Sequence, residues 1–471
     1  MSPKRMLVLA GVCLLVAVVL VACAPKAGPT AAATETAVPQ PTVEVPFLES
    51  FLGSGHADAK AEAFNHWNTP AAGATAAAVP ATCAKCHTSA GFQDFVANGK
   101  VTADVPAPAG TLGCVTCHNP AAMALTSVTF PSGKVVETSE EGEARCMTCH
   151  QGRESKTSVD KQITDFNATD ADKVPAPIKD ATTGKDRNFG FLNVHYFAAG
   201  ATLYGSQAEG GYQYDGKSYD PKFRHVEGYD TCIGCHDQHA TQVRVNDCAK
   251  CHEGVKTVDD LKNNRENGSL VDYNGNGDIK EGIYYELKGL QDILYGSIQA
   301  YATEVAGAPI VYDAATYPYF LAADANGQVL KDDKGAAVGY KNWTPRLLKA
   351  AFNYQVSSKD PGAFAHNAKY IMELLYDSVD DLNGKISKPV DMTKLARDDA
   401  GHFAGDTEPF RHWDEEGEVA AGCAKCHSAT GLPEYLANGG TEVVTKSGVQ
   451  ITGVVAQPIA NGFACSTCHD E

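Results

Sequence analysis

The chain has 471 residues, which is enough for roughly two to four domains. Its hydrophobic content of 44% and charged content of 20% are those of a globular protein, which excludes a disordered or collagen-like chain. The net charge of −18 excludes the basic surface that nucleic-acid binding requires.

Residues 1–22 have the pattern of a secretory signal peptide. Two basic residues precede an apolar stretch that ends at Ala22 and is short for a membrane span. Cys23 follows directly and resembles the lipidated cysteine of a bacterial lipobox. We therefore predict an exported lipoprotein that Cys23 anchors to a membrane, facing the periplasm or the cell exterior. An uncleaved single-span anchor is the alternative.

Cysteine usage gives the most specific signal in the sequence. Two of the sixteen cysteines, Cys13 and Cys23, belong to the leader, and the other fourteen form seven Cys-x-x-Cys-His motifs. Two thiols at this spacing reach the two vinyl groups of one porphyrin, and the adjacent histidine meets the iron. We therefore predict seven covalently bound c-type haems. In chain order, sites 1 to 7 are Cys83-Cys86-His87, Cys114-Cys117-His118, Cys146-Cys149-His150, Cys232-Cys235-His236, Cys248-Cys251-His252, Cys423-Cys426-His427 and Cys465-Cys468-His469.

The remaining histidines are candidates for the second axial ligand of each iron. Seven of the fifteen histidines are proximal, which leaves eight, whereas the mature chain has only four methionines. Iron with two imidazole ligands is six-coordinate and has no open position for substrate. His239 lies three residues after His236, too close to reach the same haem, so we expect it to bind a neighbouring haem. The distal candidates are His56, His66, His195, His225, His239, His366, His402 and His412.

The two ends of the mature chain are similar. Gly55-His56 and Phe64-Asn65-His66-Trp67 correspond to Gly401-His402 and Phe410-Arg411-His412-Trp413. A second attachment site follows site 1 and site 6, but a third follows only in the first copy. We expect the second copy to be truncated, so that the intact protein has an eighth haem. Seven haems with one spare histidine is the alternative.

The segment 259–395 contains no cysteine. Apolar residues at helical spacing predict a helix over residues 282–304. Thr344-Pro345 and Asp360-Pro361 are typical helix starts, which predict helices that end near residues 356 and 382. His366 lies near the start of the last of these helices.

Oxygen-bearing side chains at alternate positions precede the first of these helices and resemble half of a calcium loop. Ile283 stands at the twelfth position, where an EF-hand has an acidic residue, and Glu281 or Glu286 is the substitute ligand. We predict a structural Ca²⁺ site; a surface turn is the alternative. The candidate ligands are Asp272, Asn274, Asn276, Asp278 and Glu281.

These features predict a mainly α fold with extensive coil and minimal sheet, because haems replace much of the ordinary core. The predicted domains are the signal peptide 1–22, an Ala/Thr/Pro-rich tether 23–46, a three-haem module 47–155, a two-haem module 156–258, the haem-free helical segment 259–395 and the C-terminal repeat 396–471.

The seven motifs, the segment Asn193-Val194-His195-Tyr196, the pair His236 and His239, and Ala365-His366-Asn367 resemble bis-histidine multihaem c-type cytochromes. Large extracytoplasmic members of the octahaem kind are the most similar. The resemblance covers nearly all of residues 47–471. It implies closely stacked haems that pass electrons along the molecule, to an acceptor outside the cell.

The leading hypothesis is an electron-transfer protein that is not an enzyme, with other redox proteins as donor and acceptor and no nucleic-acid partner. The alternative is a multihaem reductase or oxidase of nitrogen or sulfur compounds such as nitrite, hydroxylamine or tetrathionate. Such enzymes keep one open iron, often marked by a Cys-x-x-Cys-Lys motif, and this motif does not occur here. A homo-oligomer or filament subunit is a third hypothesis.

Overall fold

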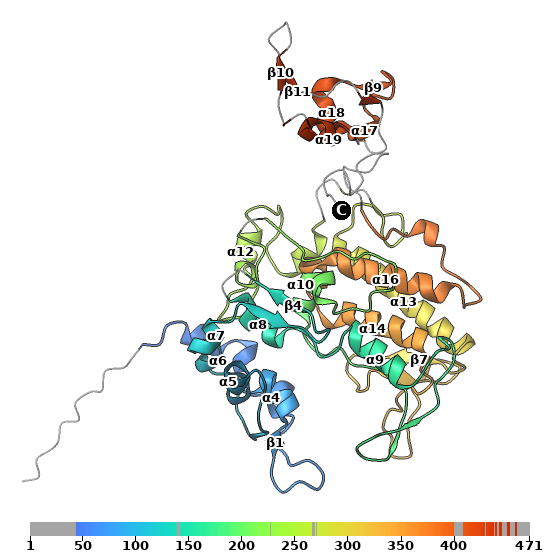
Figure 1. The fold of residues 1–471 in the computed structure, drawn as a ribbon. Coiled ribbons are helices and arrows are strands. Elements are labelled where there is room, and N and C mark those ends of the chain that lie inside the picture. The colour runs from blue at the N-terminus through green and yellow to red at the C-terminus, as the bar shows by residue number, and fades with distance from the viewer. Residues whose placement is uncertain are drawn as a thin grey trace, which may run out of the picture. The chain divides into compact units, whose positions relative to one another are not determined.

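The computed structural model describes residues 44–138, 142–226, 228–265, 269, 271–399, 408–428, 430–437, 439, 442–444, 450–452 and 457–458. In these residues helices and short strands alternate with long loops, so the predicted mainly α fold with extensive coil and little sheet is confirmed (Figure 1). The chain divides into two compact units, 1–47 and 48–471, and the second is described below. Among the described residues, no helix combines the length and the hydropathy of a membrane span. The predicted signal peptide, Cys23, His402 and site 7 lie outside these residues.

The helices are short in the haem-binding segments and long in the middle of the chain. The α-helices are α2 (Leu48–Leu52), α3 (Glu62–Asn65), α4 (Ala81–His87), α5 (Ser89–Asn98), α6 (Cys114–Cys117), α7 (Pro120–Met123), α8 (Glu143–Cys149), α9 (Lys156–Asp165), α10 (Ala199–Ala208), α11 (Cys232–Cys235), α12 (Val245–Cys248), α13 (Ile283–Glu304), α14 (Pro345–Lys359), α15 (Ala363–His366), α16 (Ala368–Asn383), α17 (Glu408–Arg411), α18 (Ala421–His427) and α19 (Gly431–Ala437). Single 3-10 turns are η1 (Gly55–Ala57), η2 (Asp259–Asn263) and η3 (Met392–Lys394).

The described strands form two-stranded antiparallel sheets. The pairs are β1 (Ala78–Val79) with β2 (Val105–Pro106), β3 (Ser127–Thr129) with β4 (Val135–Glu137), β5 (Ile178–Lys179) with β6 (Asp186–Arg187), β7 (Ile310–Tyr312) with β8 (Phe320–Ala322), β9 (Glu418–Val419) with β12 (Gln457–Pro458), and β10 (Glu442–Val444) with β11 (Gln450–Thr452).

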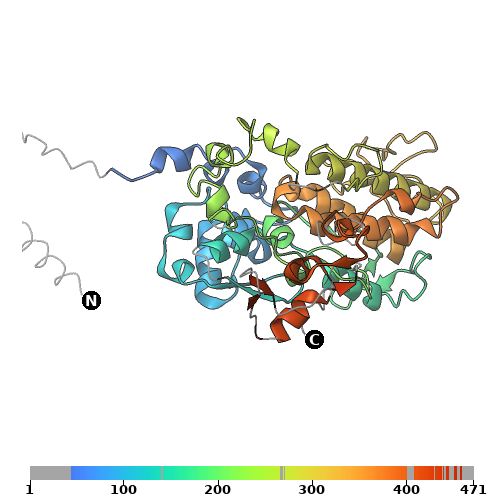
Figure 2. The ribbon, with the colours of Figure 1, turned by 90° about the horizontal axis from the view of Figure 1, so that it is seen from above.

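Helices α13, α14 and α16 pack against one another and form the main core (Figures 1 and 2). The predictions for α13 and α14 are confirmed: α13 begins at Ile283, and the Thr344 hydroxyl caps α14 by accepting a hydrogen bond from the Leu347 amide at 3.2 Å. The same hydrophobic cluster includes Met147 and Val194. Because these two residues neighbour Cys146 and His195 in sequence, the haem-free helices support haem-binding segments.

The third helix differs from its prediction. Instead of one helix from residue 360, the chain forms α15 and then α16, with a break at Asn367, whose φ is −169°. The Asn367 side chain accepts a hydrogen bond from the Tyr370 amide at 3.1 Å and donates one to the Pro221 carbonyl at 2.8 Å. This tertiary contact interrupts the helix, so His366 is the last residue of α15.

The repeat predicted from the sequence has matching local structure in its two copies. A short strand, a helix that carries the attachment motif and a second helix follow one another as β1, α4 and α5 and again as β9, α18 and α19. In both copies a glycine, Gly91 or Gly431, lies against the carbonyl of a buried alanine, Ala84 or Ala424, with no space for a Cβ atom. Glycine therefore permits the close approach of the two helices.

We predict that Gly91→Ala lowers the free energy of unfolding by about 1 to 3 kcal/mol, because the new Cβ overlaps the Ala84 carbonyl and separates α4 from α5. Urea unfolding of the purified protein measures the change. The control is Gly296→Ala: Gly296 lies exposed in α13, and a Cβ there meets nothing within 4 Å. This substitution should stabilise by about 0.5 to 1 kcal/mol; equal effects of both would contradict the packing described.

Candidate functional site

Each described attachment motif begins in a helical turn. In sites 2, 3, 4 and 5 the amide of the proximal histidine donates to the carbonyl of the first cysteine at 2.8 to 3.0 Å. Because residues i and i+3 share one face of a helical turn, both thiols of a motif lie on the same side. The local fold therefore places the two sulfurs of a motif on the same side of the chain, as attachment to one porphyrin requires.

Five of the distal candidates lie opposite a proximal histidine. The ring centroids are 5.8 Å apart for His87 and His195, 6.1 Å for His118 and His239, 6.2 Å for His150 and His56, 6.3 Å for His236 and His366, and 6.0 Å for His252 and His225. An imidazole nitrogen binds a metal ion at about 2.0 to 2.1 Å and lies about 1.1 Å from its ring centre, so two imidazoles on one iron have centroids about 6 Å apart. The five spacings fit one iron between the rings of each pair.

Burial favours the neutral form of these imidazoles, which is the form that binds metal. Loss of solvation is the largest cause, and it lowers the pKa of His195 to about 4. It also lowers the pKa values of His56, His87, His150, His225 and His236.

Backbone carbonyls orient several proximal rings. The Nδ1 atom of His87 lies 2.9 Å from the Ala63 carbonyl oxygen, and Nδ1 of His150 lies 3.2 Å from that of Phe197. When Nδ1 donates to a carbonyl, Nε2 is left as the atom that binds metal. His427 of site 6 has the same arrangement, 2.9 Å from the Pro409 carbonyl.

His366 is oriented by a carboxylate instead. Its Nδ1 atom lies 2.7 Å from Oδ2 of Asp360, which is only 3% exposed. Burial disfavours the imidazolium form, but the Asp360 charge outweighs this effect and raises the pKa of His366. A carboxylate partner makes an imidazole a stronger electron donor to a bound metal.

His66 and His412 occupy equivalent positions in the two copies of the repeat, and within the described residues neither lies opposite a proximal ring. Each Nδ1 atom contacts a glutamate four residues earlier, Glu62 at 2.7 Å and Glu408 at 2.6 Å, and each side chain is more than half exposed. The ring of the following tryptophan contacts both this histidine and the proximal one.

Thiols from different sites lie close together. Cys86 of site 1 shares a hydrogen bond with Cys149 of site 3, which lowers the pKa of Cys86 to about 7. Cys146 of site 3 shares another with Cys232 of site 4. Cys235 of site 4 lies near Cys248 of site 5: burial raises the pKa of Cys235 most, and the charge of Cys248 raises it further. Neighbouring attachment positions therefore connect site 1 through sites 3 and 4 to site 5.

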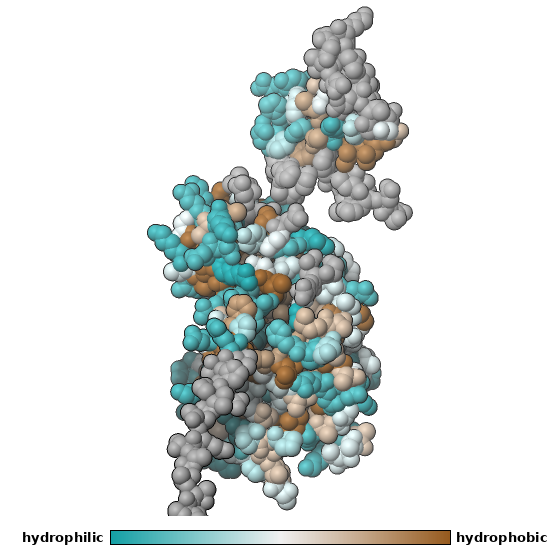
Figure 3. Space-filling model, turned by 90° about the vertical axis from the view of Figure 1, so that its left-hand side faces the viewer, coloured by the Kyte–Doolittle hydropathy of each residue, from teal (hydrophilic) through white to brown (hydrophobic). Residues whose placement is uncertain are grey.

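Apolar side chains are exposed around these histidines. Five large apolar residues near a proximal or distal histidine are 41 to 54% exposed, namely Val115, Met123, Tyr196, Phe197 and Val226. Figure 3 shows apolar residues reaching one face in several places among hydrophilic ones. Exposed apolar surface marks places where a hydrophobic ligand binds, and a porphyrin is such a ligand. The residues present therefore fit haem.

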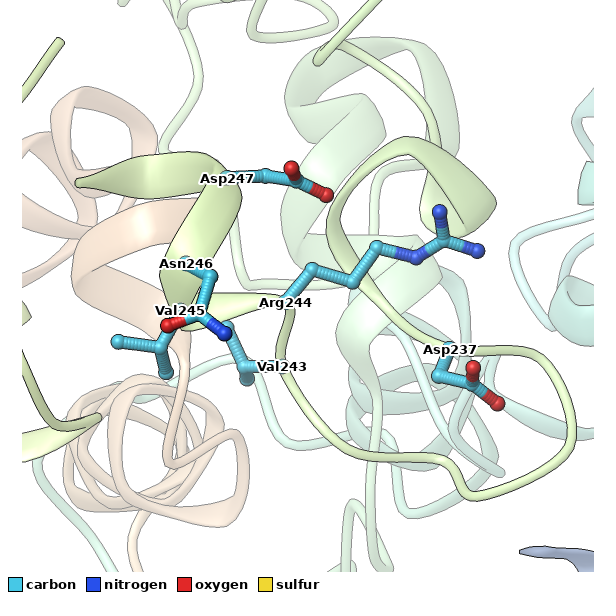
Figure 4. A pocket seen from close by; sticks show the side chains of 6 residues that line it. All are labelled: Asp237, Val243, Arg244, Val245, Asn246 and Asp247. Carbon is cyan, nitrogen blue, oxygen red and sulfur yellow. The ribbon is translucent and has the colours of Figure 1, made fainter. Parts of the chain in front are cut away.

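A cavity of about 490 Å³ lies between sites 4 and 5 (Figure 4). Its lining residues are Asp237 and Val243 to Asp247. The Arg244 side chain extends between the carboxylates of Asp237 and Asp247. Hydrogen bonds are the main cause of the lowered pKa values of both carboxylates, and the charge of Arg244 lowers these values further. The volume lies in the range of cofactor pockets, about 300 to 1,000 Å³.

The predicted calcium ligands lie in one loop before α13. Asp272, Asn274, Asn276 and Asp278 accept hydrogen bonds from backbone amides of this loop, and the Glu281 carboxylate accepts hydrogen bonds from the side-chain amides of Asn274 and Asn276. The Glu286 carboxylate accepts hydrogen bonds from the loop amides of Tyr273 and Asn274 and from the Arg265 side chain. Within the described ranges, no group of three His, Cys, Asp or Glu side chains is placed to hold a metal. Calcium binding stays a prediction.

We predict that Asp360→Asn raises the reduction potential of the haem at site 4, because a neutral partner makes His366 a weaker donor to ferric iron. The ratio of reduced to oxidised haem at a fixed potential should rise on the order of tenfold, which is about 59 mV for one electron. Spectroelectrochemical titration measures the change. The control is Glu62→Gln, which alters an equally short contact at His66 and should leave every potential unchanged.

Two relatives from Geobacter sulfurreducens match the chain. The C-type polyheme cytochrome OmcB is 25% identical over 419 residues, which cover 72% of this chain and 49% of OmcB. The C-type polyheme cytochrome OmcC is 26% identical over 335 residues, which cover 63% of this chain and 36% of OmcC. The chain thus spans about half or less of the length of these relatives. No family model and no solved structure matches it. The relatives and the attachment motifs together support a multihaem c-type cytochrome that functions in electron transfer.

Proposed function

We propose that this protein relays electrons outside the cytoplasm through closely spaced haems, each held by two histidines. The observation that carries the proposal is the set of five opposed histidine pairs, whose ring centroids lie 5.8 to 6.3 Å apart. Haem iron, when bound, supplies one-electron redox chemistry. An imidazole on each face leaves that iron without an open position, which suits transfer of electrons and not conversion of a substrate.

The attachment thiols fix the order of the relay. The thiols of sites 1 and 3 and those of sites 3 and 4 share hydrogen bonds, so porphyrins attached at these thiols would have neighbouring edges. Site 2 is also close to site 3. The pKa of Cys117 in site 2 is raised first by burial and then by the charge of Cys146 in site 3. Site 3 is therefore the position from which electrons reach sites 1, 2 and 4.

A reductase or oxidase of nitrogen or sulfur compounds is less well supported. Such an enzyme needs one iron with an exchangeable ligand. In sites 1 to 5, the proposed distal histidine would take the position where substrate binds, as the opposed rings support.

We predict that replacing any one of the five paired distal histidines by alanine converts one haem from low-spin to high-spin. The reason is that each substitution removes one of two imidazole ligands. Electron paramagnetic resonance of the oxidised protein gives the number of high-spin haems, and the mass of the exported protein gives the number of attached haems, with seven expected.

His66→Ala is the matched control, because His66 belongs to the same repeat as His56 but does not lie opposite a proximal ring in the described structure. It should leave all haems low-spin. A high-spin haem in the unaltered protein, with activity toward nitrite, hydroxylamine or tetrathionate, would support the enzyme instead of the relay.

We also propose that the protein is a lipoprotein, anchored through Cys23 and facing the periplasm or the cell exterior. The support is the leader sequence with its cysteine at the predicted cleavage position. Cys23→Ser should release the exported, haem-loaded protein from the membrane fraction, since a serine does not take the lipid. Haem staining of soluble and membrane fractions distinguishes the outcomes; an unchanged membrane fraction would indicate an uncleaved anchor.

A further inference from the structure

One buried cation next to site 1 has no carboxylate partner in the described residues. Lys359, the last residue of α14, is 2% exposed, and its ammonium group interacts with the hydroxyl of Tyr196, which is a neutral partner. Nζ lies 3.6 Å from the ring centroid of Tyr196 and 3.9 Å from that of Tyr319. Two aromatic faces offset part of the cost of burial, but an ammonium group without an anion still costs several kcal/mol.

A second buried donor lies one helical turn earlier. Gln355 is 0% exposed; its Oε1 accepts a hydrogen bond from the Val194 amide at 2.9 Å, and its side chain also interacts with the hydroxyl of Tyr312, which is a neutral partner. Residues four apart lie on one helix face. Gln355 and Lys359 therefore face the same segment, which carries the distal histidine His195, from one side of α14.

An anion would balance the charge of Lys359. The ring of Tyr196, which Lys359 contacts at 3.6 Å, belongs to the residue that directly follows His195, so Lys359 lies close to the segment that carries this histidine. His195 lies opposite His87, at the place proposed for the porphyrin of site 1. A c-type porphyrin carries two propionate carboxylates, and a carboxylate accepts hydrogen bonds from both an ammonium and an amide group.

We propose that Lys359, assisted by Gln355, is the ion-pair partner of a propionate of the haem held by His87 and His195, and that it raises the reduction potential of this haem. The proposal rests on the proposed electron relay. A nearby cation disfavours ferric haem, which carries one more positive charge than ferrous haem. Lys359 is a positioning and tuning residue and does not itself carry electrons.

The next residue acts in the opposite direction. Asp360 holds His366 at site 4 and strengthens its donation, which lowers the potential there. Lys359 at the end of α14 and Asp360 directly after it would thus give the haem of site 1 a higher reduction potential than the haem of site 4. Since sites 1 and 4 both adjoin site 3, this difference favours electron flow from site 4 through site 3 to site 1.

Lys359→Met tests the proposal, because methionine keeps the length of the side chain and removes its charge. We expect one haem to lose about tenfold in its ratio of reduced to oxidised form at a fixed potential, which is about 59 mV for one electron. Lys359→Arg should retain the potential of the unaltered protein. Lys349→Met is the control, because Lys349 lies on the same helix over a tyrosine ring, that of Tyr212 at 4.8 Å, and it should shift no haem.

The affected haem is identified in the His195→Ala background. The proposed relay makes site 1 high-spin in this variant, so its potential can be followed by electron paramagnetic resonance during the titration. A decrease there in the Lys359→Met variant supports the proposal. If the potential of the high-spin haem does not change, or if the change occurs at a low-spin haem, the proposal for Lys359 is overturned. The proposed relay is not affected by this result, because it is tested by the low-spin state of all haems in the unaltered protein.

Folding is checked by the ratio of haem to protein. If Lys359→Met does not accumulate with its haems, Lys359→Gln takes its place, because glutamine removes the charge but keeps a donor. Gln355→Leu gives an independent measurement: it should lower the same potential by a smaller amount than Lys359→Met does. An unchanged potential in both Lys359→Gln and Gln355→Leu also overturns the proposal.

Discussion

The opposition of histidine rings in five pairs is the constraint on which the arrangement of this protein depends, and we propose that one iron binds between the rings of each pair. Each pair brings two parts of the chain together with ring centres 5.8 to 6.3 Å apart, which is close to the separation of about 6 Å expected for two imidazoles on one metal ion. His56 reaches site 3 from before site 1, and His366 reaches site 4 from the far end of the haem-free segment. Distal ligands therefore connect modules that are separate in sequence.

The haem-free helices give these ligands a rigid support. α14 ends at Lys359 and is followed directly by Asp360, and the break at Asn367 sets His366 at the end of a single helical turn. A regular helix through residue 367 would lose the hydrogen bond from Asn367 to the Pro221 carbonyl. An ordinary hydrophobic core in the haem-free segment thus positions side chains that we propose contact haem in the other segments.

Local signals in the sequence were sufficient for part of this structure. The attachment motifs, the helix beginning near residue 282 and the Thr344-Pro345 helix start could be predicted because each depends on neighbouring residues. The pairing of histidines could not, since it depends on packing between distant segments. The burial of the Lys359 ammonium could not be predicted for the same reason: no local pattern distinguishes it from a surface lysine. His66 and His412 match ligand positions in sequence, yet their local helix turns them toward glutamates.

The contacts between thiols of different sites have a consequence for how the protein is made. Cys86 with Cys149 and Cys146 with Cys232 are near enough to share hydrogen bonds before any thioether exists. In an oxidising compartment, neighbouring thiols form disulfides. A chain that collapsed before its cofactors arrived would cross-link these cysteines and block attachment, so the proposed export and haem attachment require that the thiols stay reduced until the haems are bound.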